Sequence, residues 1–291
     1  MPYALQRSKR SRFPLSGMAG VCEHAVMVST LALSQLRHAC SIPTALALSV
    51  VTFTPTAFAA PCAPPPQGEG HVAEIIDGRS FRLSDGREIR LAGIEPSGAT
   101  KEERTTALSA ILANRDVSLG GNDDAPDRYG RQTAFVYLPP SETPVQEQLV
   151  AAGAALVLPD VEDKDCATAL LSAESEARRA QRGTWAENSV IKNAESPDDI
   201  LAGVGHFVVV EGKVLSVRQA GATTYLNFGR NWTRGFAVTI SRRILPAFEN
   251  AGVALKSLEN RRIRVRGWVE GNAGPRIDVL RVGQVELLGA N

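Results

Sequence analysis

Three short strands are predicted where the chain reads HVAEIIDGRSFRLSDGREIRLAGI, residues 71–94. Apolar and polar residues alternate over 71–76, 80–83 and 88–94, which is the period of strands that bury one face. An Asp-Gly pair at 85–86 separates the last two segments and is typical of a tight hairpin turn. We therefore expect an antiparallel meander in this part of the chain.

Further elements follow in an order that suggests a barrel. We expect helices over 101–113, from a capping box at Thr143 to Gly153, and from an N-cap at Asp165 to Gln181, with strands over 116–119 and 134–138. Five strands arranged in this way among three helices predict a β-barrel of the OB type.

Several residues in and after the meander carry a resemblance. Asp77-Gly78-Arg79-Ser80 follows the first strand, Arg90 lies in the third segment with Glu95 directly after it, and Asp127-Arg128-Tyr129-Gly130-Arg131 precedes the last strand. In order and spacing, residues 70–187 resemble the staphylococcal nuclease (thermonuclease) family. The resemblance implies an OB-type barrel and calcium-dependent hydrolysis of DNA or RNA.

Two arginines match the phosphate-binding residues that the resemblance implies. Arg90 and Arg131 take the positions of the family's catalytic arginines, and we expect both to face one pocket. A guanidinium suits this role because it contacts two phosphate oxygens at once and stays protonated. The bland interpretation is a solvated strand arginine at 90 and a turn at 129–131.

The metal and base positions depart from the family pattern. The family motif reads Asp-Gly-Asp-Thr, and Arg79 stands here at its calcium-binding aspartate; Glu95 matches the second ligand. Gly98 stands where the family has its catalytic glutamate. Loss of a general base typically costs about a hundred- to ten-thousandfold in rate. We expect Arg79 and Glu95 to form an ion pair where calcium would sit.

Two replacements for the missing groups remain open. Asp77 could supply part of the metal site beside Glu95, and Glu102 or Glu103 could reach the pocket as the acid. Calcium is therefore a cofactor by resemblance only.

The N-terminus predicts an export signal. Residues 42–53 are apolar but too few to span a bilayer, and Ala57-Phe58-Ala59 fits signal peptidase, so we expect residues 1–59 to be a leader, with Met27 as an alternative start. Residues 60–69 are then a tether. The mature chain keeps Cys62 and Cys166, and two cysteines in an oxidising compartment favour a disulfide over two unrelated thiols. We expect a periplasmic or secreted protein without a stable membrane span.

The two halves of the chain differ in charge. Residues 68–187 hold 13 Lys and Arg against 21 Asp and Glu, a net charge of −8, whereas residues 204–291 hold 13 against 6, a net charge of +7. Residues 188–203 contain Asn, Ser and Pro without an apolar period and are predicted to be a linker. Strands over 207–217, 225–228, 236–240, 262–269 and 276–279, with a helix over 244–251, predict a second OB-like barrel at 204–291.

The second barrel has candidates for nucleic-acid binding. Arginines and aromatic residues interleave there: Arg262, Arg264, Arg266, Tyr225 and Trp268. Basic grooves with aromatic platforms bind single strands on OB barrels. Two alternatives remain open, a solvated basic face over an aromatic core and docking of the basic barrel on the acidic one.

Together these features predict a thermonuclease-like envelope protein that binds nucleic acid or another phosphate-bearing ligand and has weak or lost calcium-dependent hydrolysis. The alternative is a non-catalytic periplasmic binding or scaffold protein.

Overall fold

A computed structural model describes residues 62–98, 100–186, 190–231 and 233–289. All of these lie in one compact unit, Thr56–Asn291. The predicted leader at 1–59, with its alternative start at Met27, lies outside the described residues. Within the described ranges, no helix combines the length and the apolar character needed to cross a bilayer.

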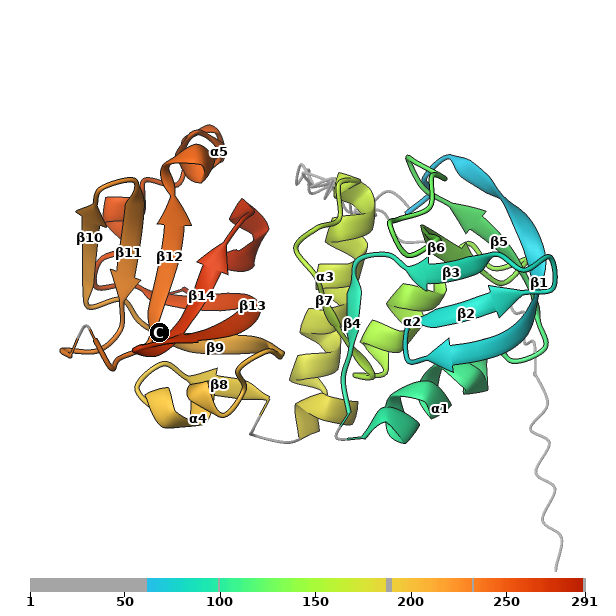
Figure 1. The fold of residues 1–291 in the computed structure, drawn as a ribbon, viewed down its shortest axis with the longest axis horizontal. Helices are drawn as coiled ribbons and strands as arrows, with labels where there is room; N and C mark the ends of the chain where they lie inside the picture. The colour runs from blue at the N-terminus through green and yellow to red at the C-terminus, as the bar shows by residue number, and fades with distance from the viewer. Residues whose placement is uncertain (1–61, 99, 187–189, 232, 290–291) are drawn as a thin grey trace, which may run out of the picture. The chain divides into compact units, whose positions relative to one another are not determined.

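Five strands form the first barrel, which Figure 1 draws in cyan to green, and they close in the order β1-β2-β3-β6-β5. They are β1 Pro66–Asp77, β2 Ser80–Leu83, β3 Glu88–Leu91, β5 Asp116–Gly120 and β6 Arg131–Tyr137. Only the β3–β6 pair among them is parallel. This is the OB topology and confirms the predicted fold class.

β1 is longer than the alternation predicts. Register shifts after Pro66, Val72 and Ile75 bend it, so that its first half pairs with β5 and its second half with β2. The tether prediction for 60–69 is therefore wrong from Pro66 onward. That stretch lacks an apolar period because backbone pairing with β5, rather than burial of alternate side chains, holds it in the barrel.

The third predicted strand is interrupted at Gly93. This glycine has a φ of +70°, and an added Cβ would lie 2.4 Å from Cγ2 of Val161, so only glycine fits there. The chain then leaves the barrel and forms β4 Ile94–Pro96, which pairs with β7 Ala155–Val157 outside it.

Three helices accompany the first barrel, as predicted: α1 Lys101–Leu112, α2 Val145–Ala151 and α3 Lys164–Arg179. Their caps differ from the predictions. The N-cap of α2 is Pro144 without a side-chain bond, because Gln146 turns inward and bonds the backbone of Val136 and Ala134. The N-cap of α3 is Asp163 rather than Asp165.

The predicted disulfide joins Cys62 to Cys166, and this prediction is confirmed. Both cysteines are buried in the core of the first barrel with Phe81, Ile89 and Leu170. The bridge therefore ties the start of the described chain to α3.

The second barrel consists of β9 Phe207–Lys213, β10 Ser216–Ala220, β11 Thr223–Asn227, β12 Ala237–Ser241, β13 Arg262–Asn272 and β14 Gly274–Val279, with helix α5 Leu245–Asn250. Its sheet runs β10-β11-β12-β14-β13-β9, and β12 and β14 are parallel. Only Val214 and Leu215 separate β9 from β10. The two strands are therefore halves of one interrupted strand, and they lie at opposite ends of this strand order. This is again the OB order.

The predicted linker at 188–203 contains regular structure. Within it lie β8 Ile191–Asn193, which extends the sheet beside β9, and helix α4 Pro197–Leu201. Sequence alternation missed them because both are short, and β8 is recruited by backbone pairing with a longer strand. A last strand, β15 Val285–Leu287, pairs with β13.

Candidate functional site

The hairpin between β1 and β2 positions Asp77 and Arg79. Asp77 Oδ1 accepts a hydrogen bond of 2.8 Å from the backbone N–H of Arg79, which closes the turn. Gly78 fits against its neighbours, since a Cβ there would lie 2.7 Å from Cβ of Arg104 and 3.0 Å from Cβ of Pro96. The turn thus holds Arg79 beside the strand that carries Glu95.

Arg79 and Glu95 form the ion pair that the sequence predicts. Their side chains are only 18% and 20% exposed. Burial raises the pKa of the Glu95 carboxyl, while the charges of Arg79 and Arg90 oppose that rise. The guanidinium therefore supplies the positive charge that a partly buried carboxylate needs at this position.

Arg90 lies next to this pair on β3, opposite Ser80 on β2 and Thr133 on β6. Burial lowers the pKa of its half-buried guanidinium, and the charges of Arg79 and Arg131 lower it further. Within the described part of the chain, Arg90 makes no hydrogen bond or ion pair. The charges of Glu95 and Asp77 offset part of this effect, and a bound anion would offset the rest.

Arg90 and Arg79 line a hollow of about 340 Å³, together with Trp268 and Phe207. Arg131 is not among its lining residues. The structure thus brings together Arg79, Arg90 and Glu95, and Arg131 is close enough for its charge to lower the pKa of Arg90 although it does not line this hollow.

Arg131 is occupied by a neighbour in its own loop. Its Nη2 and Nε donate to Asp127 Oδ2 at 2.8 and 3.1 Å, and its guanidinium lies 4.9 Å from the ring centre of Tyr129. The hydrogen bond from Arg131 lowers the pKa of Asp127 to about 2. Asp127 is part of the motif quoted above, yet its residue type alone did not show that it would hold the arginine.

This pairing predicts a pH-dependent stability. Because the pKa of Asp127 is depressed, its contribution is present above its unfolded pKa of about 4 and is lost as the pH falls towards 2. Asp127→Asn should flatten the dependence of unfolding on pH between 4 and 2, measured by urea denaturation. Asp124→Asn, at an exposed residue of the same loop, is the control. Equal slopes for Asp127→Asn and the wild type would contradict the assignment.

The residues present do not fit a calcium ion. Arg79 donates to Glu95, the carboxylate that matches a family ligand, and Asp77 is used by the turn. In the part of the chain that the structure describes, no three His, Cys, Asp or Glu side chains cluster as a metal site would require. The donor set therefore favours a cation–anion pair over a bound divalent cation.

The acids that could replace the missing base are engaged elsewhere. Gly98 has a φ of +130°, and its carbonyl accepts a bond of 2.8 Å from Arg104. Glu103 completes the capping box of α1 with Thr100, and Glu102 lines a different hollow beside Ile76. Neither glutamate lines the hollow of Arg90.

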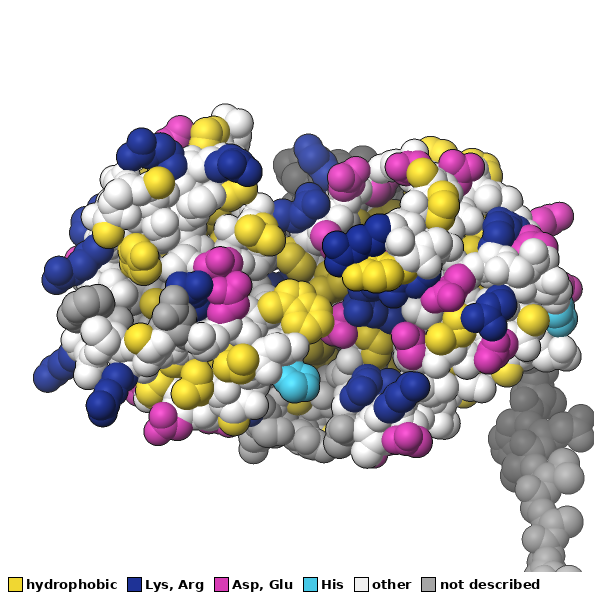
Figure 2. Space-filling model, in the orientation of Figure 1, with side chains coloured by type: hydrophobic (Ala, Val, Ile, Leu, Met, Phe, Trp, Pro, Cys, Tyr) yellow, Lys and Arg dark blue, Asp and Glu magenta, His cyan; other side chains and the backbone are white. Residues whose placement is uncertain are grey.

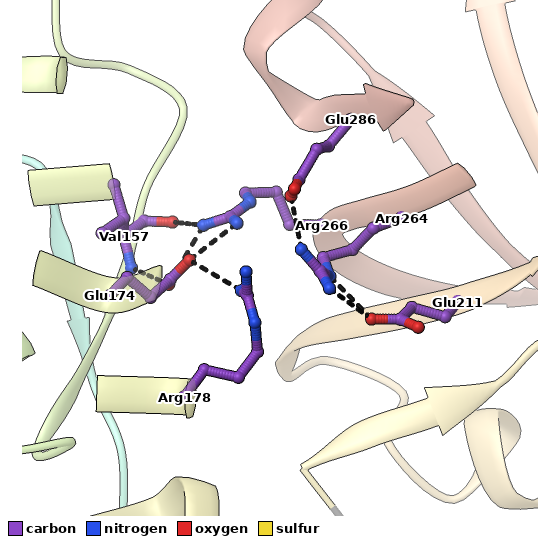
Figure 3. A network of polar contacts seen from close by, with 7 residues as sticks. All are labelled: Val157, Glu174, Arg178, Glu211, Arg264, Arg266 and Glu286. Atoms are coloured by element: carbon purple, nitrogen blue, oxygen red, sulfur yellow. Dashed lines mark hydrogen bonds and ion pairs between the residues drawn. The ribbon is translucent and has the colours of Figure 1, made fainter. Parts of the chain in front are cut away.

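Two of the five predicted nucleic-acid residues are buried. Arg264 lies between Glu211 and Glu286, and Arg266 is 3% exposed and pairs with Glu174 on α3, as Figure 3 shows. The prediction that Arg264 and Arg266 belong to an accessible nucleic-acid-binding face is therefore wrong. Apolar residues, including Trp185 and Leu156, pack around Val209 of the neighbouring strand and exclude water from this face.

The other three predicted residues remain accessible. Arg262 is exposed on β13, Tyr225 is half-buried on β11, and Trp268 is 47% exposed with its ring edge-on to Phe207. Glu174, the partner of Arg266 on α3, is 1% exposed. Alternation along β13 showed that Arg262, Arg264 and Arg266 share one face of the strand, but it could not show what covers that face.

Comparison with known families gives one match. A family model described as staphylococcal nuclease homologue matches residues 98–187, which contain α1 to α3, β5, β6 and Arg131. The match begins after the strands that carry Arg79, Arg90 and Glu95. A comparison with curated proteins found no match.

Proposed function

Starting from a chain whose residues 98–187 match a family model described as staphylococcal nuclease homologue, we propose a periplasmic or secreted protein that binds DNA, RNA or another phosphate-bearing ligand and hydrolyses it weakly or not at all. The observation that carries this proposal is Arg90: a half-buried guanidinium without a partner among the described residues, beside an ion pair at the family's metal position.

Phosphate binding follows from the charges around Arg90. A cation that is partly desolvated and repelled by two other arginines gains most from an anion, and a phosphate oxygen accepts from guanidinium with good geometry. Arg79 keeps part of its charge neutralised by Glu95, so Arg90 is the principal contact.

Weak hydrolysis follows from the groups that catalysis lacks. Phosphodiester hydrolysis needs a polarising cation and a positioned base, and both family positions hold other chemistry here, Arg79 and Gly98. Arg90 can stabilise charge on a bound phosphate, but the carboxylates that line its hollow, Asp160, Glu270 and Asp278, do not stand at the position of the family's catalytic glutamate. The ligand is thus held rather than turned over efficiently.

A fluorescent single-stranded DNA tests the proposal. Its binding and its hydrolysis by the full-length chain are measured with calcium and with a chelator. We expect binding that Arg90→Ala weakens by about ten- to a hundredfold, since hydrogen bonds to charged groups contribute roughly 1.5–3 kcal/mol. Cleavage should not exceed the Arg90→Ala background in either condition. Arg128→Ala, which removes an exposed arginine from the loop before β6, is the matched control.

Either of two results would overturn the proposal. Calcium-dependent cleavage that is lost in both Arg90→Ala and Arg131→Ala would mean that the site is rebuilt as a working nuclease. Unchanged DNA binding in Arg90→Ala would remove the phosphate site.

The second candidate is a non-catalytic scaffold, which the Arg79–Glu95 pair favours because it stabilises the site without a ligand. Arg79→Asp separates the candidates, since it restores the carboxylate that the family has at this position. If the site descends from a calcium site and keeps its geometry, calcium should raise the Tm of Arg79→Asp and not that of Arg79→Ala. A scaffold without that geometry should show no shift in either.

A further inference from the structure

Four strands of the second barrel turn one face inward and the other outward. Val217, Leu226, Val238 and Ile277 are aligned across β10, β11, β12 and β14 and pack in or against the core. Side chains alternate along a strand, so the neighbouring residues point to the outer face. The hollow on this outer face shares no lining residue with the hollow of Arg90.

Two aligned rows make up the outer face. One contains Arg218, Tyr225, Thr239 and Asp278, and the other contains Ser216, Asn227, Ala237 and Arg276. Short side chains, Ser216, Asn227, Ala237 and Thr239, stand beside the longer ones, Arg218, Tyr225 and Arg276. Long side chains next to short ones leave a depression on this face.

The depression is a hollow of about 510 Å³. Ser216, Tyr225, Thr239 and Arg276 line it from the strands, and Arg230 and Thr233 line it from the loop between β11 and β12. This volume lies within the range of small-ligand pockets, roughly 300–1,000 Å³.

The charge of this hollow is positive. Arg218, Arg230 and Arg276 line it, and among the described residues none of its lining side chains is Asp or Glu. Arg276 is paired with Glu270 at 2.8 Å, whereas Arg230 makes no hydrogen bond or ion pair with the described residues. Lys and Arg side chains also stand along the edge of this barrel where Figure 1 labels β10 (Figure 2).

We propose that this hollow is a second binding site, which takes a single-stranded nucleic acid with phosphates on Arg218 and Arg230 and a base against Tyr225. Arginines without strong partners attract a phosphate backbone, and an aromatic ring half-buried at the floor offers a base a surface to stack on. A polyanion without bases would use the arginines but would gain nothing from the tyrosine. The aromatic residue therefore selects nucleic acid over other anions.

The test measures fluorescence anisotropy of a labelled 15-nucleotide oligothymidine and of an abasic strand of equal length. The full-length chain carries Arg90→Ala throughout, so that the site of the first barrel does not contribute and failure of one proposal leaves the other standing. We expect the thymidine strand to bind more tightly than the abasic strand. Tyr225→Leu should weaken thymidine binding by roughly five- to a hundredfold and leave abasic binding unchanged.

The arginines should set the salt dependence. Arg218→Ala and Arg230→Ala should each reduce the slope of log affinity against log salt by about 0.7, the value for one phosphate contact on a single strand. Arg262→Ala is the matched control, because Arg262 is exposed on β13 outside the hollow and should not change the slope by as much.

Three outcomes would overturn the proposal: equal affinity for the thymidine and abasic strands, unchanged thymidine binding in Tyr225→Leu, or equal effects of Arg262→Ala and Arg218→Ala. Unfolding curves of each variant separate lost contacts from lost structure. Arg230→Ala changes an exposed loop residue and should keep the wild-type Tm, so the proposal stays testable even if Tyr225→Leu is destabilised.

Discussion

Glu174→Ala is expected to lower the free energy of unfolding by about 3–5 kcal/mol, the usual cost of removing one partner from a buried ion pair. Glu174 Oε2 accepts from Arg266 Nη2 at 2.8 Å, and its Oε1 accepts from the backbone N–H of Val157 at 2.9 Å (Figure 3). The Arg266 side chain is 3% exposed and the Glu174 side chain 1%. Alanine would leave the buried guanidinium without a counter-charge, with only the Val157 carbonyl still accepting from it, and the Val157 N–H without an acceptor.

Urea denaturation with matched variants would measure this effect. Glu176→Ala, an exposed glutamate on the same helix, should change stability by less than about 0.5 kcal/mol. Glu174→Leu combined with Arg266→Met should lose less stability than Glu174→Ala, because the only charge then left without Glu174 is Arg178, which is 22% exposed rather than fully buried. A loss below about 1 kcal/mol for Glu174→Ala would show that water reaches Arg266 and that the pair is not buried in solution.

Replacing both Cys62 and Cys166 with alanine is expected to cost about 4–5 kcal/mol. The bridge closes a loop with a sequence separation of 104, and a cross-link of this length removes much conformational entropy from the unfolded chain. Both sulfurs are buried in the first core, so the variant also loses packing. The value is among the largest that a single covalent feature contributes to a chain of this size.

The measurement compares urea denaturation of the wild type and the double variant, each with and without a reductant. Reductant should destabilise the wild type towards the double variant and should leave the double variant unchanged. The same midpoint for all four samples would be inconsistent with a stabilising bridge. A large effect would also mean that folding benefits from an oxidising compartment, which accords with the proposed export.

Much of the first barrel could be predicted from local pattern. Alternation marked β2 and β3, and an Asp-Gly pair marked the hairpin between them, because these signals act between residues close in sequence. The disulfide followed from counting cysteines. At the site, charge complementarity between Arg79 and Glu95 was enough to predict their pairing, since the resemblance placed both at one position.

What only the tertiary structure decided was the fate of charges whose partners are distant in sequence. Arg266 and Glu174 are separated by 92 residues in the sequence. Each lies in a segment rich in charged residues, which is typical of an exposed face. The partner of Arg131 was also missed, although Asp127 is only four residues away, because the loop geometry rather than the residue types brings the two together. A sequence reports which groups carry charge, whereas burial and partner choice depend on which surfaces the folded chain brings into contact.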